Sequence, residues 1–248
     1  MSGHSKWATI KRQKGANDAK RGQVFTKLAR EITVAARSGI PDPEMNFRLR
    51  LAVQKARSEN MPKDNIDRAI ERAAGGAGGD NYDEVFYEGY GPAGVALMVQ
   101  AMTDNRNRTV SEVRAIFTRS GGTLGENGSV GWMFDHVGQI VVDPGPTDPD
   151  DIALTAIDAG AVDVQVEGED VEIYTEVQDL HKALEAINAA GVDVKSSELI
   201  MKPKTLLTAE PDTAVKVIRM IEKLEDLDDV QQVYTNLDVT DEVLAEVT

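Results

Sequence analysis

The chain has 248 residues, 41% of them hydrophobic, which is enough for one large domain or two to three small ones with real cores. It contains no cysteine, which excludes thiol nucleophiles, disulfide bonds and cysteine-based zinc sites. The formal net charge is −15, yet the first 79 residues carry 16 Lys and Arg against eight Asp and Glu, which leaves about −23 on the remainder. This polarity predicts a polyanionic partner, because clustered positive charge attracts phosphate in a salt-dependent way.

Residues 2–16 lack apolar periodicity and are expected to form a basic arm that orders on its partner. The arm contributes Lys6, Lys11, Arg12 and Lys14. Trp7 lies within it, apart from any core pattern, and either stacks on a base or packs locally.

Apolar residues recur at three- and four-residue intervals over residues 17–37, which predicts a helix with one core face and one basic face. The core face comprises Val24, Phe25, Leu28, Ile32 and Ala35. A solvated surface is the alternative interpretation of the basic face. The nucleic-acid contacts expected from the arm and this helix are Lys6, Trp7, Lys11, Arg12, Lys14, Lys20, Arg21, Lys27, Arg30 and Arg37.

Asp42-Pro43 is typical of a helix start, with an N-cap followed by proline, and predicts a second helix to about Asn60. A third helix is expected at residues 62–74. The glycine-rich run at 75–79 has almost no side chains to pack and predicts a linker. Residues 1–79 are therefore expected to form a three-helix domain.

Short strands alternate with helices after the linker. We expect strands at 84–89 and 95–102 and a helix at 110–119, where Thr109 and Glu112 fit a capping box. From 135 to 203 the expected order is strand 139–143, helix 149–159, strands 162–166 and 171–174, helix 180–190 and strand 192–200. This βαββαβ order is that of a ferredoxin-like unit.

A further helix at 213–224 and a strand at 230–236 supply the elements needed to complete the middle domain, which residues 135–203 interrupt. The predicted fold class is therefore α+β, with three domains: basic and helical (1–79), acidic α+β (80–134 plus 204–248), and an inserted acidic ferredoxin-like domain (135–203).

Patterns of catalysis or metal binding are not found. His4, His136 and His181 are far apart and match no metal-ligand spacing. The glycine-rich stretch 121–131 lacks the G-K-[ST] ending of a phosphate-binding loop and is expected to be a flexible loop. No catalytic residue, metal or cofactor is predicted, and the chain is expected not to be an enzyme.

The longest apolar runs, such as residues 94–102, are far shorter than the roughly 20 residues of a membrane-spanning helix. The basic N-terminus is not followed by the apolar stretch of a secretory signal. A cytoplasmic protein with no membrane partner is therefore expected.

A polar loop, T-D-N-R-N-R-T at 103–109, leads into the N-terminus of an expected helix. Helical N–H groups and the helix dipole favour an anion there, and Arg106 and Arg108 add two charges. These two arginines are therefore further candidate phosphate contacts. The alternative is internal ion pairing with the many nearby acids.

Several motifs occur in a fixed order along nearly the whole chain: S-G-H-S-K-W-A-T-I-K at 2–11, D-A-K-R-G at 18–22, F-T-K at 25–27, N-M-P-K-D-N-I at 60–66, Y-E-G-Y-G-P at 87–92, T-D-N-R-N-R-T at 103–109 and G-S-V at 128–130. Together they closely resemble the YebC-type proteins. The sequence departs from many relatives at 10–15, I-K-R-Q-K-G, where they have a histidine and an alanine-rich continuation, but the positive charge is kept.

The resemblance implies a helical domain followed by two α+β domains. It also implies regulation of gene expression, since the family includes probable transcriptional regulators that bind DNA, a mitochondrial translational activator of a cytochrome oxidase subunit, and members linked to relief of ribosome stalling on proline-rich stretches. The hypotheses are thus a DNA-binding transcriptional regulator or, as the alternative, a ribosome-associated translation factor that binds ribosomal RNA. A protein-interaction module whose acidic domains bind a basic protein is the second alternative.

Overall fold

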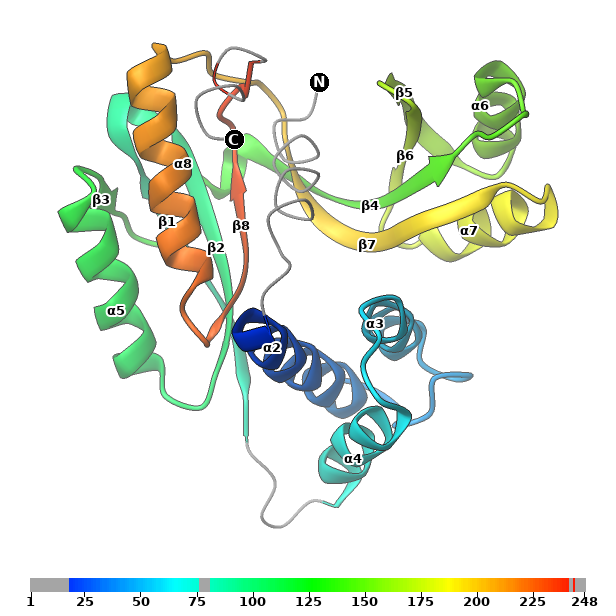
Figure 1. Ribbon diagram of the computed structural model, residues 1–248, viewed down its shortest axis with the longest axis horizontal. Coiled ribbons are helices and arrows are strands. Elements are labelled where there is room, and N and C mark those ends of the chain that lie inside the picture. Colours follow the sequence, from blue (N-terminus) through cyan, green and yellow to red (C-terminus); the bar gives the residue numbers. More distant parts are fainter. Residues whose placement is uncertain (1–17, 76–80, 241–242, 244–248) are drawn as a thin grey trace. The chain divides into compact units, whose positions relative to one another are not determined.

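The computed structural model describes residues 18–75, 81–240 and 243. They separate into two compact units, one formed by Asp135–Lys202 and one formed by the described residues on either side of that segment (Figure 1). The predicted arm at 2–16 and the predicted linker beyond Gly75 lie outside the described residues. The division of the larger unit into a helical and an α+β domain stays a prediction.

The helical region contains α2 (Asp18–Arg37), α3 (Phe47–Ser58) and α4 (Lys63–Ala74). Its core joins Leu28 and Ile32 of α2 to Leu49 of α3 and Ile66 of α4. The expectation that Val24 belongs to this core is wrong, because its side chain is 37% exposed.

The predicted start of the second helix at Asp42-Pro43 is also wrong, since α3 begins at Phe47. The carboxylate of Asp42 accepts a hydrogen bond from the Glu44 N–H, and the Met45 N–H donates to the Asp42 carbonyl, so Asp42 closes a turn instead. The side chain of Asn46 caps α3 by accepting from the Leu49 N–H at 3.0 Å.

The larger unit also contains a four-stranded antiparallel sheet with the order β3-β1-β2-β8. Its strands are β1 (Asp83–Tyr90), β2 (Ala96–Thr103), β3 (Thr123–Leu124) and β8 (Val230–Thr235). Two helices, α5 (Arg106–Arg119) and α8 (Pro211–Glu225), contact the sheet and each other. Short 3₁₀ helices occur at Pro92–Gly94 and Gly131–Met133.

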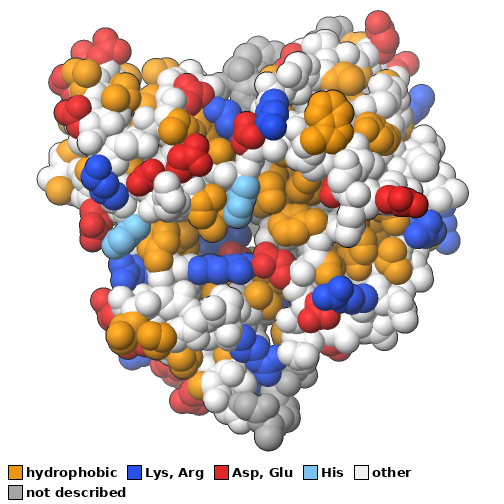
Figure 2. Space-filling view, turned by 180° about the vertical axis from the view of Figure 1, so that it is seen from behind, with side chains coloured by type: hydrophobic (Ala, Val, Ile, Leu, Met, Phe, Trp, Pro, Cys, Tyr) orange, Lys and Arg blue, Asp and Glu red, His pale blue; other side chains and the backbone are white. Residues whose placement is uncertain are grey.

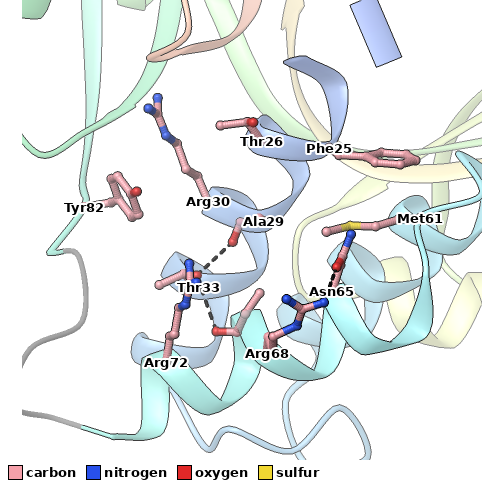
Figure 3. A pocket seen from close by; sticks show the side chains of 11 residues that line it. Phe25, Thr26, Ala29, Arg30, Thr33, Met61, Asn65, Arg68, Arg72 and Tyr82 are labelled. Atoms are coloured by element: carbon pink, nitrogen blue, oxygen red, sulfur yellow. Dashed lines mark hydrogen bonds between the residues drawn. The ribbon is translucent and has the colours of Figure 1, made fainter. Parts of the chain in front are cut away.

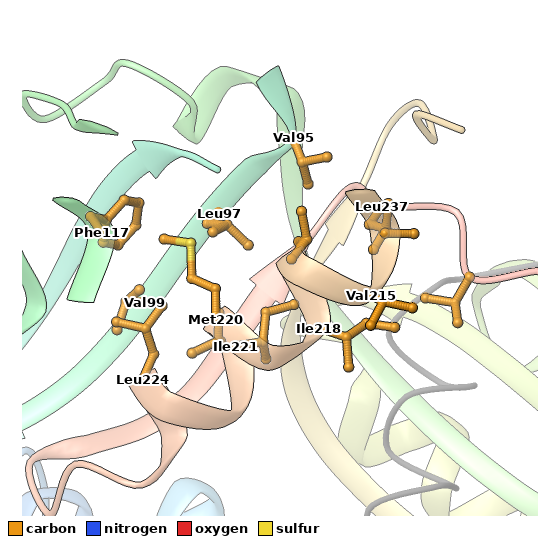
Figure 4. Close-up of a cluster of buried hydrophobic side chains, with 14 of the residues drawn as sticks. Val95, Leu97, Val99, Phe117, Val215, Ile218, Met220, Ile221, Leu224 and Leu237 are labelled. Atoms are coloured by element: carbon orange, nitrogen blue, oxygen red, sulfur yellow. The ribbon is translucent and has the colours of Figure 1, made fainter. Parts of the chain in front are cut away.

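The core of this sheet is mostly aliphatic, with Phe117 of α5 and Met220 of α8 added, and it lies under α8. Figure 4 shows Leu97 and Val99 of β2 facing Ile218, Ile221 and other α8 side chains. Strand β8 follows the Asp135–Lys202 unit in sequence but pairs with β2, which precedes it. The smaller unit is therefore inserted within the α+β part of the chain.

Helix α5 starts earlier than the capping-box pattern predicts. The side chain of Asn105 caps it by accepting from the Arg108 N–H at 3.1 Å. Thr109, the predicted cap, lies inside the helix, where its hydroxyl donates to buried Asp229 instead.

The inserted unit has the strand order β5-β6-β4-β7, with antiparallel β4–β6 and β5–β6 pairs. Its elements in chain order are β4 (Phe134–Asp143), α6 (Pro149–Asp158), β5 (Ala161–Glu167), β6 (Asp170–Glu176), α7 (Leu180–Ala189) and β7 (Asp193–Pro203). Helices α6 and α7 contact each other and the same sheet. This is the ferredoxin-like arrangement, so the predicted fold class is confirmed.

The glycine-rich loop that follows α5 is held by a carboxylate. Buried Glu88 accepts hydrogen bonds from the N–H groups of Gly128, Val130 and Gly131 at 2.6–2.9 Å. Burial raises the pKa of this carboxyl, but the three N–H donors more than offset it, and the pKa lies below its usual value. The loop is thus tied to β1.

Candidate nucleic-acid interface

The predicted basic contacts differ in what the structure shows of them. Lys6, Trp7, Lys11, Arg12 and Lys14 lie outside the described residues, and Lys20 belongs to the first turn of α2. The remaining predicted contacts lie on α2 and on α5, within the larger unit.

The basic face of α2 is joined to the connection between α8 and β8. The ammonium of Lys27 donates to the Glu225 carbonyl, and Arg30 donates to the Asp228 carbonyl at 2.6 Å. Farther along the helix, Arg37 donates to the side chain of Asn81 at 2.9 Å. These predicted phosphate contacts therefore have acceptors inside the unit.

Asp229 gathers four donors from three elements. Its carboxylate lies 2.7 Å from Arg30 of α2 and 2.8 Å from Arg108 of α5, and its side chain is 3% exposed. The hydroxyls of Thr109 and Thr103 donate to the same carboxylate at 2.6 and 3.1 Å. We call this set the Asp229 cluster: Asp229, Arg30, Arg108, Thr103 and Thr109. It links α2, α5 and the end of β2 to the start of β8.

The electrostatics of the cluster favour the ionised carboxylate. Burial raises the pKa of Asp229, but the hydrogen bonds from Thr109 and Arg108 and the charge of Arg30 outweigh it, so the pKa lies below its usual value. Hydrogen bonds to Asp229 and Asp104 raise the pKa of the Arg108 guanidinium. The cluster therefore holds its charges at neutral pH.

The two loop arginines that were expected to meet phosphate are both paired with acids. Arg106 donates to Asp83 at 2.7 Å and is 64% exposed, and Arg108 donates to Asp104 as well as to Asp229. On the face drawn in Figure 2, Lys and Arg side chains lie next to Asp and Glu side chains in several places. The observed contacts at this loop are those of internal ion pairing.

A cleft of about 280 Å³ lies between α2 and α4 (Figure 3). We call it the α2–α4 cleft, and it is lined by Phe25, Thr26, Ala29, Arg30, Thr33, Met61, Asn65, Arg68, Ala69, Arg72 and Tyr82. Its lining thus combines three arginines with two aromatic rings, a methionine and an amide.

Helix α4 presents Asn65, Arg68 and Arg72 to the cleft because these residues are three and four positions apart. Arg68 donates to the Asn65 side chain at 2.8 Å and to the Asp64 carbonyl at 3.0 Å. Arg72 is exposed and makes no hydrogen bond or ion pair with the described residues. Within the described part of the chain, neither guanidinium is paired with a carboxylate.

Two arginines of the cleft region meet aromatic rings. Arg30 lies over Tyr82, 5.2 Å from the ring centroid, and Arg21 lies 5.6 Å from the centroid of Phe25. The Nε of Arg30 is buried and has no acceptor among the described residues, which is an unusual state for a charged donor.

Arg68, Arg72, Phe25 and Tyr82 were not among the predicted contacts. The four-residue spacing of Arg68 and Arg72 on an expected helix is a signal that the sequence does contain. Tyr82 gives no such signal, because its place beside Arg30 depends on how the residues just before β1 pack against α2.

Metal chemistry has no support in the described residues, among which no group of three or more His, Asp or Glu side chains could hold an ion. His181 pairs with Glu185 on α7 at 3.4 Å, and His136 is exposed in β4. No described helix is long and apolar enough to cross a membrane.

Family models match both parts of the sequence. Residues 5–76 match the TACO1/YebC protein N-terminal domain, and residues 82–237 match the TACO1/YebC second and third domain. The chain belongs to the TACO1/YebC family. The resemblance that the sequence motifs indicate is thereby confirmed.

The relatives within the TACO1/YebC family match over nearly their whole length. A probable transcriptional regulatory protein of Chloroflexus aggregans is 56% identical over 247 residues, covering 98% of each chain. One of Herpetosiphon aurantiacus is 54% identical over 244 residues, covering 98% of this chain and 97% of the relative. The crystal structure of a conserved hypothetical protein from Aquifex aeolicus is 46% identical, with a TM-score of 0.82 over 89% of this chain and 91% of that one.

Proposed function

We propose that this chain is a non-enzymatic regulator of gene expression that binds nucleic acid through its basic N-terminal region. The observation that carries the proposal is the charge distribution, about +8 over residues 1–79 against about −23 over the rest. A positive segment of this kind supplies the salt-dependent attraction to phosphate on which nucleic-acid binding depends. The family, whose relatives are named probable transcriptional regulatory proteins, supports regulation.

The proposed contacts are the basic arm, the exposed Arg21 of α2, and Arg68 and Arg72 of the α2–α4 cleft. Arg30 and Arg108 are assigned a different role, since both donate to buried Asp229. Their charges hold α2 and α5 against the start of β8.

Recognition of the sugar–phosphate backbone is favoured over reading of base sequence. The side-chain amides of α2 and α4 are those of Gln23 and Asn65. Gln23 donates to the Asp226 carbonyl and to Asp228, and the Asn65 oxygen accepts from Arg68. Apart from the NH₂ group of Asn65, the basic helices therefore offer mainly cations, and cations on phosphate position a protein without specifying sequence.

This observation favours a second candidate function, a translation factor that binds ribosomal RNA. Structured RNA is recognised largely by shape and backbone contacts, whereas a transcriptional regulator needs base-reading side chains. A ribosomal location also suits a chain whose other regions are acidic. The phosphates of the surrounding RNA repel acidic regions, so only the basic region would bind RNA.

The test is ultraviolet crosslinking in cells followed by sequencing of the attached nucleic acid. The intact protein is compared with a Lys11→Glu/Arg12→Glu/Lys14→Glu variant and with a control of equal charge change on α8, Lys216→Glu/Arg219→Glu/Lys223→Glu. Reads that are lost in the arm variant and kept in the control support the proposal. Reads at promoters indicate transcription, and reads on ribosomal RNA indicate translation.

Equal enrichment for all three proteins would contradict binding through the arm. Such a result would favour the protein-interaction alternative, in which the acidic regions bind a basic protein.

A further inference from the structure

We propose that the α2–α4 cleft binds one unpaired nucleotide of a single-stranded nucleic acid, with the base against Phe25 and Met61 and the adjoining phosphate on Arg68 and Arg72. This inference rests on the proposed nucleic-acid binding and adds the form of nucleic acid that is bound. The four residues all line the cleft.

The size of the cleft limits what it can hold. Its volume of about 280 Å³ is slightly below the roughly 300 Å³ at which pockets begin to bury a drug-sized molecule. A monomer unit of a strand fits this volume, and a helix of nucleic acid does not. A base that is paired in a duplex is stacked on its neighbours and cannot enter.

The cleft offers the two kinds of surface that a nucleotide needs. Phe25, Met61 and Ala69 supply apolar contact, and aromatic rings stack on bases of any sequence. Figure 3 shows Phe25 and Met61 close together at one end of the cleft, with Asn65 and Arg68 beside them. The Asn65 oxygen accepts from Arg68, which leaves its NH₂ group to donate to an acceptor on the base.

The positive charge of Arg68 and Arg72 favours an anion in the cleft. Arg68 and Arg72 are one helical turn apart, and two like charges at that spacing repel each other. No described carboxylate pairs with either, whereas Arg30, Arg48, Arg106 and Arg108 all meet one. A phosphate between the two guanidiniums relieves the repulsion and accepts charge-assisted hydrogen bonds.

The binding experiment uses the full chain and fluorescence anisotropy with four labelled probes of equal length. They are a single-stranded RNA, a single-stranded DNA, a DNA duplex and a DNA strand in which every base is replaced by an abasic site. The RNA and DNA strands distinguish the two sources of an unpaired nucleotide. Wild type is expected to bind a base-carrying single strand about 10-fold more tightly than the abasic strand, because stacking is lost in the latter.

Two variants distinguish the contribution of the base contact to binding from that of the phosphate contact. Phe25→Leu keeps an apolar side chain and is expected to bind the base-carrying and abasic strands almost equally. Arg68→Gln/Arg72→Gln is expected to weaken binding of both strands by about 10-fold or more. The matched control, Arg114→Gln/Arg119→Gln, removes two exposed arginines of α5 outside the cleft and is expected to stay within about 2-fold of wild type. Urea midpoints confirm that each variant is folded.

Three results would overturn the inference, and they are distinguishable. If wild type binds none of the probes, both this site and the proposed function fail. If wild type binds but the cleft variant behaves like the α5 control, the cleft is not the site and the proposed function stands. If wild type binds duplex and abasic strands as tightly as base-carrying single strands, no base enters the cleft.

Discussion

Arg30 and Arg108 of the Asp229 cluster lie in the same unit as Arg68 and Arg72 of the α2–α4 cleft, yet the surroundings of the two pairs are opposite, although Arg30 also lines the cleft. Arg30 and Arg108 donate to a buried carboxylate, whereas Arg68 and Arg72 meet no carboxylate among the described residues. The first pair is therefore assigned to stability and the second to binding. Positive charge in a sequence indicates a polyanion partner only where the fold leaves that charge without an internal acid.

The largest expected effect comes from removing the acid at the centre of the first region. Asp229→Ala leaves Arg30 and Arg108 without the carboxylate they share, and the hydroxyl of Thr109 without its acceptor. Removing one partner of a buried ion pair costs about 3–5 kcal/mol, and we expect a loss of that size in urea unfolding. Asp228→Ala, at the exposed neighbouring position, is the control and is expected to change stability by less than about 0.5 kcal/mol.

If both aspartate variants lost the same stability, the Asp229 cluster would not hold the larger unit together. The contrast between the two neighbours is therefore as informative as the size of either effect.

Replacing one arginine of each region by glutamine, in separate variants, is expected to give the next largest difference in stability. Arg30→Gln removes a hydrogen bond to a buried carboxylate, for which we expect a loss of about 1.5–3 kcal/mol. Arg72→Gln changes an exposed side chain without described partners and is expected to stay within about 0.5 kcal/mol. Thermal unfolding of the two variants measures the difference. Equal thermal unfolding midpoints for the two variants would contradict the different roles assigned to the two regions.

The dependence of the unfolding free energy on pH tests the contribution of the Asp229 carboxylate to the Asp229 cluster. The folded pKa of Asp229 lies below its unfolded value of about 3.9, so its contribution is present at neutral pH and is lost as pH falls below about 4. Asp229→Asn is expected to show a shallower fall in unfolding free energy between about pH 6 and pH 3 than wild type. A residual slope stays, because the carboxyls of Glu88 and Asp163 also have lowered pKa values. Parallel profiles for wild type and variant would show that Asp229 does not take part.

The smallest effect is expected at the exposed pair Arg106–Asp83, which has the same chemistry without burial. Asp83→Asn is expected to cost about 0.2–1 kcal/mol at low salt, since exposed ion pairs contribute little. At 1 M NaCl the difference from wild type should vanish, because screening reduces the interaction between exposed charges. A loss as large as that of Asp229→Ala would mean that burial does not explain the contrast.

The sequence predicts the elements of the fold better than their ends. The apolar periodicity of residues 17–37 and the βαββαβ order after residue 135 correspond to α2 and to the inserted unit. The predicted starts of α3 and α5 are wrong because side-chain hydrogen bonds at Asp42, Asn46 and Asn105 decide them. Such bonds depend on which acceptors the fold brings near, and periodicity contains no information about that.

The sequence predicts that the candidate site is positively charged, but it does not predict which residues form it. Net charge indicates that residues 1–79 attract phosphate, but it does not show that Asp229, about 200 positions later in the chain, meets Arg30. Conversely, Arg68 and Arg72 line a cleft, and become a candidate site, only because α2 packs beside α4 and contributes Phe25 to the same cleft.

The most direct test of the division between the two regions is the salt dependence of nucleic-acid binding. The slope of log K against log salt concentration reports the number of phosphates that cations contact, at about 0.7 per contact for single strands. We expect Arg68→Gln/Arg72→Gln to lower the magnitude of the slope by about 1.4 and Arg114→Gln/Arg119→Gln to leave it unchanged. An unchanged slope in the cleft variant, with wild-type binding intact, would contradict the assignment of these arginines to phosphate.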